Sequence, residues 1–163
     1  MPELQRLHAG HAPAVLAFEL VNRACFAASV SDRGDACFDR FTDRFDALPA
    51  EQEAGVCVFH VLVAGDGSVL GRFNLYDLED GTAVLGYRVA RHAAGRGTAT
   101  ATVLELCDLA ATRYGLRTLR AATAHANAAS RRVLVKAGFV PFGPAELGGK
   151  PGTWYRRPLT PPR

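Results

Sequence analysis

The order of apolar and polar residues predicts a helical front followed by a longer stretch of strands and helices. Residues Glu3–Leu7 alternate in character and read as a short edge strand. His11 and Pro13 open a helix, and apolar residues that recur at spacings of three and four predict a second amphipathic helix over Asp35–Leu48. Pro49 would end that helix because proline has no N–H to donate.

From Val56 onward the pattern becomes that of β-strands. Val56–Val63 is almost entirely apolar, as expected of a strand that is covered on both faces. The Asp-Gly pairs at positions 66–67 and 80–81 favour tight turns. We therefore expect Val69–Leu78 to run back antiparallel and Thr82–Ala90 to follow as the third strand of a meander.

The remaining chain alternates helix and strand. Thr98–Tyr114 has helical spacing, and Leu116–Ala124 reads as the next strand. Because a helix separates Leu116–Ala124 from Thr82–Ala90, these two strands should run parallel with a right-handed crossover. The last predicted features are an N-cap at Asn127, a helix end at Gly138 and a hairpin that begins at Phe139.

Composition places the chain among ordinary globular proteins. The 163 residues, of which 48% are hydrophobic and 21% charged, suit one domain over residues 1–163. The net charge of +3 is scattered, which argues against nucleic-acid binding, and there is no membrane span or leader segment, so we expect a cytoplasmic protein. No metal site is expected, because the cysteines are widely spaced structural thiols: Cys25, Cys37, Cys57 and Cys107.

The stretch Leu85–Ala101 carries the clearest chemical signal. Gly95 and Gly97 free the backbone between a strand and a helix to approach a ligand, and Arg91 and Arg96 add positive charge. Successive amides there, together with a helix N-terminus, favour a phosphate group. The fingerprints of nucleotide loops and dinucleotide folds do not fit, and a glycine loop that only turns the chain remains the alternative.

Two motifs together resemble the GNAT superfamily of N-acetyltransferases, most nearly the RimJ/RimL type. The marked positions of the family's turn motif correspond to Ala94, Gly97 and Ala99, and those of its second motif to Asn127, Ser130, Gly138 and Phe139. Ala94 departs from the usual Gln or Arg. The resemblance implies an α/β, three-layer fold: a central mixed sheet of six or seven strands with helices on both faces and splayed parallel central strands.

The resemblance also implies where acetyl-CoA binds. The strand before the turn would meet the pantetheine arm and the thioester oxygen through its backbone, and the turn amides would hold the pyrophosphate. The cofactor-binding residues implied in this way are Val89, Ala90, Arg91, Ala94, Gly95, Arg96, Gly97, Thr98, Ala99, Asn127 and Ser130.

The catalytic groups are less clearly defined. Many family members place a tyrosine seven residues after the Asn, but this chain has Leu134, and Val84 stands where a Glu often serves near the amine. By resemblance to RimL-like members, Ser130 is the candidate acid for the leaving thiolate. His125 is the candidate base, because histidine exchanges protons near neutral pH. The alternatives for the base are Glu79, Asp77, Glu19 and water.

The first helix offers further polar side chains. In the family the first two helices wall the acceptor groove, and Glu19, Asn22 and Arg23 fall on what could be an inward face. A solvated helix face is the simpler interpretation of each.

The resulting hypothesis is an acetyl-CoA-dependent N-acetyltransferase that acts as a monomer or homodimer. Its acceptor would be a primary amine, either a protein N-terminus or a small molecule. The alternative is a non-catalytic acyl-CoA-binding sensor, and a nucleotide-binding regulatory module is a weaker third reading.

Overall fold

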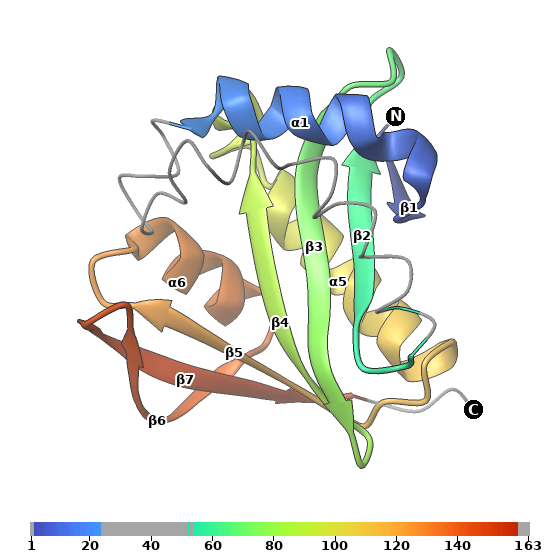
Figure 1. Ribbon diagram of the computed structural model, residues 1–163. Coiled ribbons are helices and arrows are strands. Elements are labelled where there is room, and N and C mark those ends of the chain that lie inside the picture. The colour runs from blue at the N-terminus through green and yellow to red at the C-terminus, as the bar shows by residue number, and fades with distance from the viewer. Residues whose placement is uncertain (1, 24–51, 53, 160–163) are drawn as a thin grey trace. The chain divides into compact units, whose positions relative to one another are not determined.

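A computed structural model describes residues 2–23, 52 and 54–159 (Figure 1). The helix expected over Asp35–Leu48 and its end at Pro49 lie outside these residues, as do Cys25 and Cys37. The described elements follow in order: β1 Glu3–Arg6, η1 Ala9–His11, α1 Ala12–Val21, β2 Val58–Val63, β3 Val69–Glu79, β4 Thr82–Val89, η2 Arg91–Ala93, α5 Thr98–Thr112, β5 Thr118–Ala124, α6 Ala128–Lys136, β6 Val140–Leu147 and β7 Lys150–Pro158.

The strands form one mixed sheet of seven, in the order β1-β2-β3-β4-β5-β7-β6. Strands β4 and β5 are parallel, and β5–β7 and β6–β7 are antiparallel, which confirms the predicted α/β class. The β4–β5 register runs only from Thr82 opposite Thr118 to Val84 opposite Arg120. The pairing of the parallel strands therefore ends at Val84, well before the end of β4 at Val89.

The chain divides into two compact units, each built from two segments. The first unit comprises Met1–Asn74 and Tyr87–Ala93, and the second comprises Leu75–Gly86 and Ala94–Arg163. Strands β3 and β4 contribute residues to both units. A single domain over residues 1–163 stays a prediction.

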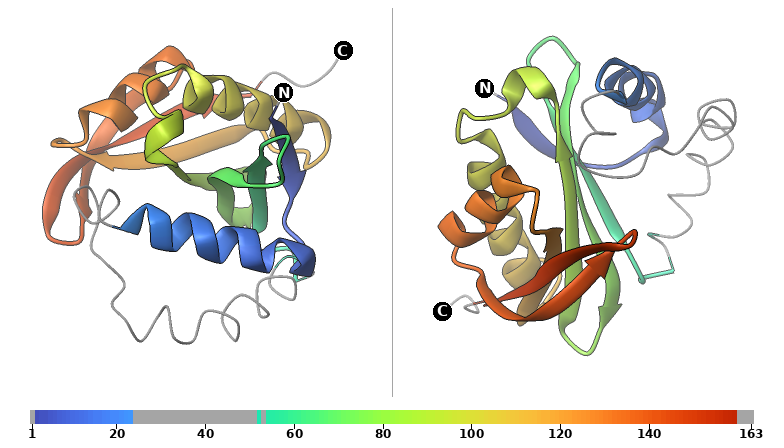
Figure 2. Two further views of the ribbon diagram at one scale, coloured as in Figure 1. Left: turned by 90° about the horizontal axis from the view of Figure 1, so that it is seen from above. Right: turned by 90° about the vertical axis from the view of Figure 1, so that its left-hand side faces the viewer.

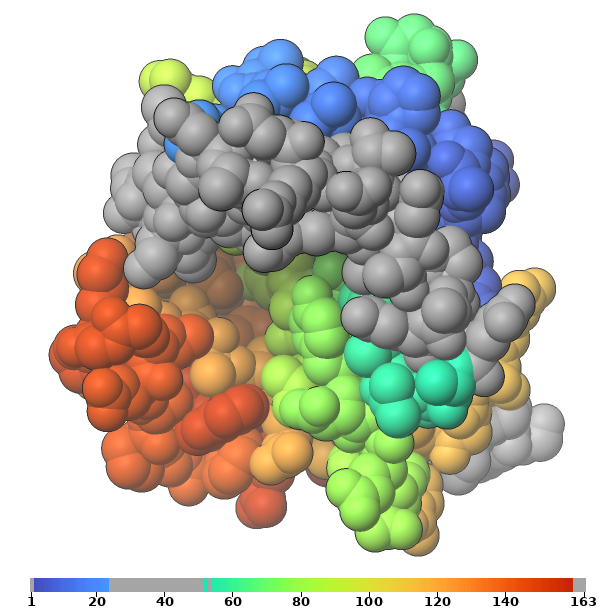
Figure 3. All heavy atoms as spheres, in the orientation of Figure 1, coloured from blue at the N-terminus to red at the C-terminus, as the bar shows by residue number. Residues whose placement is uncertain are grey.

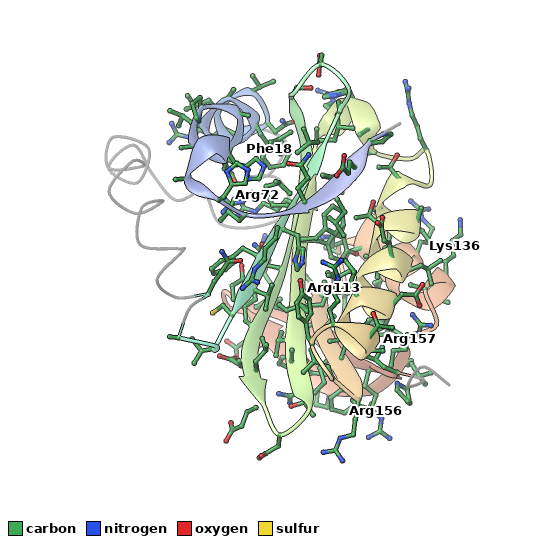
Figure 4. All side chains as sticks on the ribbon, turned by 90° about the vertical axis from the view of Figure 1, so that its right-hand side faces the viewer. Phe18, Arg72, Arg113, Lys136, Arg156 and Arg157 are labelled. Carbon is green, nitrogen blue, oxygen red and sulfur yellow. The ribbon has the colours of Figure 1, made fainter. Side chains whose placement is uncertain are left out.

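The first unit is held together by α1 packed on its strands. Pro13 stands in the first turn of α1, where the missing N–H costs nothing, as the sequence predicted. Val15 and Phe18 are buried, whereas Val21 at the C-terminal end is 81% exposed. Figure 4 shows Phe18 beneath α1. The core of this unit also includes Leu7, Phe59, Val61, Val69, Ala90 and Ala93.

Both predicted β-turns are confirmed by their backbone geometry. At the first turn, Gly67 has φ +88°, and the Ala64 amide donates to the Ser68 carbonyl at 2.8 Å. At the second turn, Asp80 and Gly81 both have positive φ, +52° and +78°, as a two-residue hairpin turn requires. These turns fix the β2–β3–β4 meander.

In the second unit α5 and α6 lie side by side (Figure 2). The helical spacing predicted for α5 is confirmed by its buried residues, which are Thr102, Val103, Leu106, Cys107 and Ala110. Burial raises the pKa of the Cys107 thiol, although the nearby Arg157 guanidinium opposes the shift. Helix α6 ends as predicted: Gly138 has φ +90°, and the Phe139 amide donates back to the Leu134 carbonyl at 2.9 Å.

Buried His60 in β2 makes the stability of the protein depend on pH. It is 2% exposed, and burial lowers its pKa from 6.5 to about 4. On acidification the unfolded chain takes up the proton first, so this contribution to stability is complete above pH 6.5 and is lost as pH falls toward 4. We expect the free energy of unfolding to fall by about 3 kcal/mol more in the wild type than in His60→Gln over this range. Urea unfolding at several pH values measures the difference, and parallel curves for the two proteins would contradict it.

Candidate active site

The turn before α5 has the geometry of an anion-binding site. Gly95 and Gly97 have φ +76° and +78°, which side chains rarely adopt, and Gly97 is the N-cap of α5. No side chain caps the helix, and its first internal hydrogen bond runs from the Ala101 amide to the Gly97 carbonyl. The amides of the first turn, Thr98 to Thr100, therefore lack an intrahelical acceptor. A Cβ at Gly95 or Gly97 would meet no protein atom within 4 Å, so the space beside both is open.

The start of α6 carries the second motif. Asn127 caps the helix as predicted, and its Oδ1 accepts from the Ser130 amide at 3.2 Å. The structure thus brings Asn127 and Ser130 together through the backbone of Ser130. Both residues are half-buried. Leu134, one turn further along, is 1% exposed and belongs to the core, so this position contributes packing.

His125 lies at the end of β5 and faces the last hairpin. Its amide donates to the Pro151 carbonyl at 3.0 Å, and its Nε2 lies 3.1 Å from Thr153 Oγ1. The residue is exposed and lines a shallow groove of about 460 Å³ with residues of the β6–β7 hairpin, including Phe142 and Gly152. An exposed imidazole with a hydroxyl partner is accessible to an acceptor.

The end of β4 and the two residues that follow it belong to the first unit, and the amides of these two residues already have partners. The Ala90 amide donates to the Leu70 carbonyl at 2.7 Å, and the Arg91 amide donates to Asn22 Oδ1 at 2.9 Å. Since successive N–H groups of a strand point to opposite sides, the Val89 amide points away from β3. Of these backbone groups, the Val89 amide is the one directed toward the opposite edge of β4.

Glu19 of α1 lies in a buried ion cluster. Its Oε1 accepts from Arg72 Nη1 at 2.9 Å and its Oε2 from Arg88 Nη1 at 3.0 Å, so both carboxylate oxygens face guanidinium groups. Figure 4 shows Arg72 near α1. The cluster ties α1 to β3 and β4, and it engages both carboxylate oxygens of Glu19.

A solvated face is therefore the wrong interpretation for two of the three polar residues of the first helix. Glu19 is 3% exposed and Asn22 is 5% exposed, while Arg23 is half-buried. Asn22 also donates from Nδ2 to the Phe18 carbonyl at 2.8 Å. The Asn22 side chain joins the C-terminal end of α1 to the start of η2.

Two of the alternative bases, Asp77 and Glu79, are exposed near the end of β3. Asp77 has φ +52° inside the strand, an unusual conformation for a non-glycine residue. Nothing in their surroundings selects either carboxylate as a base.

Sequence reasoning missed two features of these units. One is the pairing of the Arg91 amide with Asn22, which are far apart in the sequence. The other is a set of contacting aromatic and arginine side chains on β5, β6 and β7, in which Arg120 lies over Trp154. Neither has a local signal, because each contact joins separate elements.

Within residues 2–23, 52 and 54–159, no three His, Cys, Asp or Glu side chains are grouped so that they could hold a metal ion. None of the helices in this part of the chain combines the length and apolar character needed to cross a membrane.

The family model described as Acetyltransferase (GNAT) domain matches residues 3–140. A comparison with curated protein sequences found no match.

Solved structures similar to this chain include the following three. The ribosomal-protein-S5-alanine acetyltransferase from Vibrio fischeri has a TM-score of 0.89 at 18% identity, over 97% of this chain and 93% of that one. RimJ from Mycobacterium smegmatis in complex with CoA-disulfide has a TM-score of 0.85 at 21% identity, over 95% of this chain and 80% of that one. Spermidine N-acetyltransferase from Vibrio cholerae in complex with CoA and spermine has a TM-score of 0.80 at 14% identity, over 97% of this chain and 95% of that one. At these identities the likeness establishes the fold.

Proposed function

The chain belongs to the acetyltransferase (GNAT) family, and we propose that it transfers the acetyl group of acetyl-CoA to the N-terminal amine of a protein. The observation that carries this proposal is the uncapped, glycine-framed start of α5, which suits a pyrophosphate. The ribosomal-protein-S5-alanine acetyltransferase among the similar structures supports a protein acceptor over a small amine. Action in the cytoplasm as a monomer or homodimer, without nucleic acid or metal, stays a prediction.

The cofactor-binding residues are proposed with different roles. The amides of Ala94–Ala99 would hold the pyrophosphate. The exposed side chains of Arg96 and Arg91 would add positive charge. The Val89 amide would polarise the thioester carbonyl. The Ala90 and Arg91 amides already donate hydrogen bonds within the protein. These two residues would therefore contribute by shaping the backbone around Val89.

The reaction requires two proton movements. As the acceptor nitrogen bonds to the acetyl carbon and the C–S bond breaks, the amine must lose a proton and the thiolate must gain one. We assign the Ser130 hydroxyl as the donor to the thiolate. The amine proton would pass to His125, which the groove leaves accessible, or to water.

The test combines ligand binding with turnover. Acetyl-CoA at ~100 times its dissociation constant should add about 2.7 kcal/mol to the stability of the protein, and ATP or NAD should not. Free-thiol release should then follow with peptides that carry a free N-terminus and be slower with spermidine. Stabilisation by acetyl-CoA without turnover of any amine would favour the acyl-CoA-binding sensor instead.

A further inference from the structure

One face of the β5–β7–β6 part of the sheet is free of α5 and α6. Strand register places Arg120 opposite Arg156 and Ala122 opposite Trp154, so these side chains share a face. The alternate residues, such as Leu119 and Ala121, are buried on the other face. On that face Arg157 of β7 interacts with Cys107 of α5. Arg120 and Trp154 are half-buried and Arg156 is exposed. Figure 3 shows the β6–β7 hairpin, in orange and red, at the surface.

Four neighbouring side chains on this face form a series of contacts that we call the arginine–aromatic ladder: Arg120, Trp154, Phe142 and Arg156. Arg120 Cζ lies 5.5 Å from the centre of the Trp154 ring. The Trp154 and Phe142 ring centres are 6.4 Å apart, and Arg156 Cζ lies 5.4 Å from the Phe142 ring. Stacking fixes each guanidinium by its flat face and leaves its N–H edge to bind a planar anion such as a carboxylate.

The charge of this face is of one sign. Within β5, β6 and β7 the acidic residue is Glu146, and its pairing with Pro151 puts it on the face opposite the ladder. Lys150, paired with Leu147, falls on the ladder face beyond Trp154. On the ladder face, the residues of these three strands therefore carry only positive charge, which complements a negatively charged partner.

We propose that the arginine–aromatic ladder binds acidic side chains of the acceptor protein, downstream of the N-terminal amine that is acetylated. This inference rests on the proposed function, which places the amine near His125. By register Thr153, the partner of His125, falls on the face opposite the ladder, but Phe142 of the ladder lines the same groove as His125 and connects the two. Arg120 precedes His125 by five residues, or ~16 Å at ~3.3 Å per residue of strand. An extended acceptor spans the same length in about five residues, so the ladder selects Asp or Glu near the fifth position.

The first experiment uses ten-residue peptides that differ only at positions four to six, with Asp and Glu in one and Asn and Gln in the other. We expect kcat/KM to be about tenfold higher for the acidic peptide, as two partly exposed charge pairs allow. Arg120→Gln combined with Arg156→Gln should reduce this preference to less than about twofold, and added salt should weaken it in the wild type. Arg113→Gln, which neutralises an exposed arginine just after α5 (Figure 4), is the matched control and should retain the preference.

Charge reversal gives a sharper result. Arg120→Glu combined with Arg156→Glu should prefer a peptide with lysine at positions four to six over the acidic one. A wild-type enzyme without preference between acidic and neutral peptides would overturn the proposal, as would loss of the preference in Arg113→Gln.

Binding measured without turnover distinguishes this proposal from the proposed function. Fluorescence anisotropy of the same labelled peptides should show ladder-dependent acidic preference even if no peptide is acetylated; that combination would support the ladder and contradict the acetylation of protein N-termini. Single-stranded oligouridine is the competing probe, since arginine and aromatic side chains also suit nucleic acid. Ladder-dependent oligouridine binding without peptide preference would overturn the proposal.

Discussion

Gly97→Val is expected to weaken acetyl-CoA binding by at least ~100-fold, because its side chain would occupy the space that the pyrophosphate needs at the start of α5. The Cβ would meet no protein atom within 4 Å, so the added bulk faces the ligand space instead of the core. Isothermal titration with acetyl-CoA measures the effect, and far-UV circular dichroism checks that the variant is folded.

Because Gly97 has a positive φ, any other residue at this position would also strain the backbone. A matched control separates the effect of this strain from the occupation of the pyrophosphate space. Gly149, in the turn between β6 and β7, has φ +82° and equally open space around its Cβ position. Gly149→Val should therefore lose a similar ~1–3 kcal/mol of stability while keeping acetyl-CoA affinity. A Gly97→Val protein with wild-type affinity would show that the turn before α5 does not hold the cofactor.

Ser130→Ala is expected to lower kcat by at least ~10²-fold with little change in acetyl-CoA affinity, since general acid help is typically worth 10²–10⁴-fold. The cap of α6 should survive, because it uses the Ser130 amide and the Asn127 side chain, both of which the variant keeps. Single-turnover kinetics, with binding measured separately, isolates the loss to the hydroxyl.

Two comparisons make the Ser130 result decisive. Asn127→Ala removes the capping oxygen and should cost ~1 kcal/mol of stability, which Ser130→Ala should not. Near-normal kcat in Ser130→Ala would mean that water or a group of the acceptor protonates the thiolate.

The sequence by itself determined the features that rest on local sterics and hydrogen bonding. Gly67, Gly81, Gly97 and Gly138 stand where the backbone has positive φ, and each turn or helix end was predicted at that position. The Asn127 cap was predicted in the same way, since its partner lies three residues further on. Helix periodicity identified the buried side of α5, because one face of a helix must pack on the sheet.

Only the tertiary structure decided what the polar residues do. Glu19 and Asn22 could be read as solvated from the sequence, but their partners Arg72, Arg88 and the Arg91 amide come from distant elements and make burial favourable. The same holds for His125, which is directed to Thr153 by the pairing of β5 with β7. The arginine–aromatic ladder likewise exists only because strand register aligns residues of β5, β6 and β7; a one-residue slip would move every side chain to the other face.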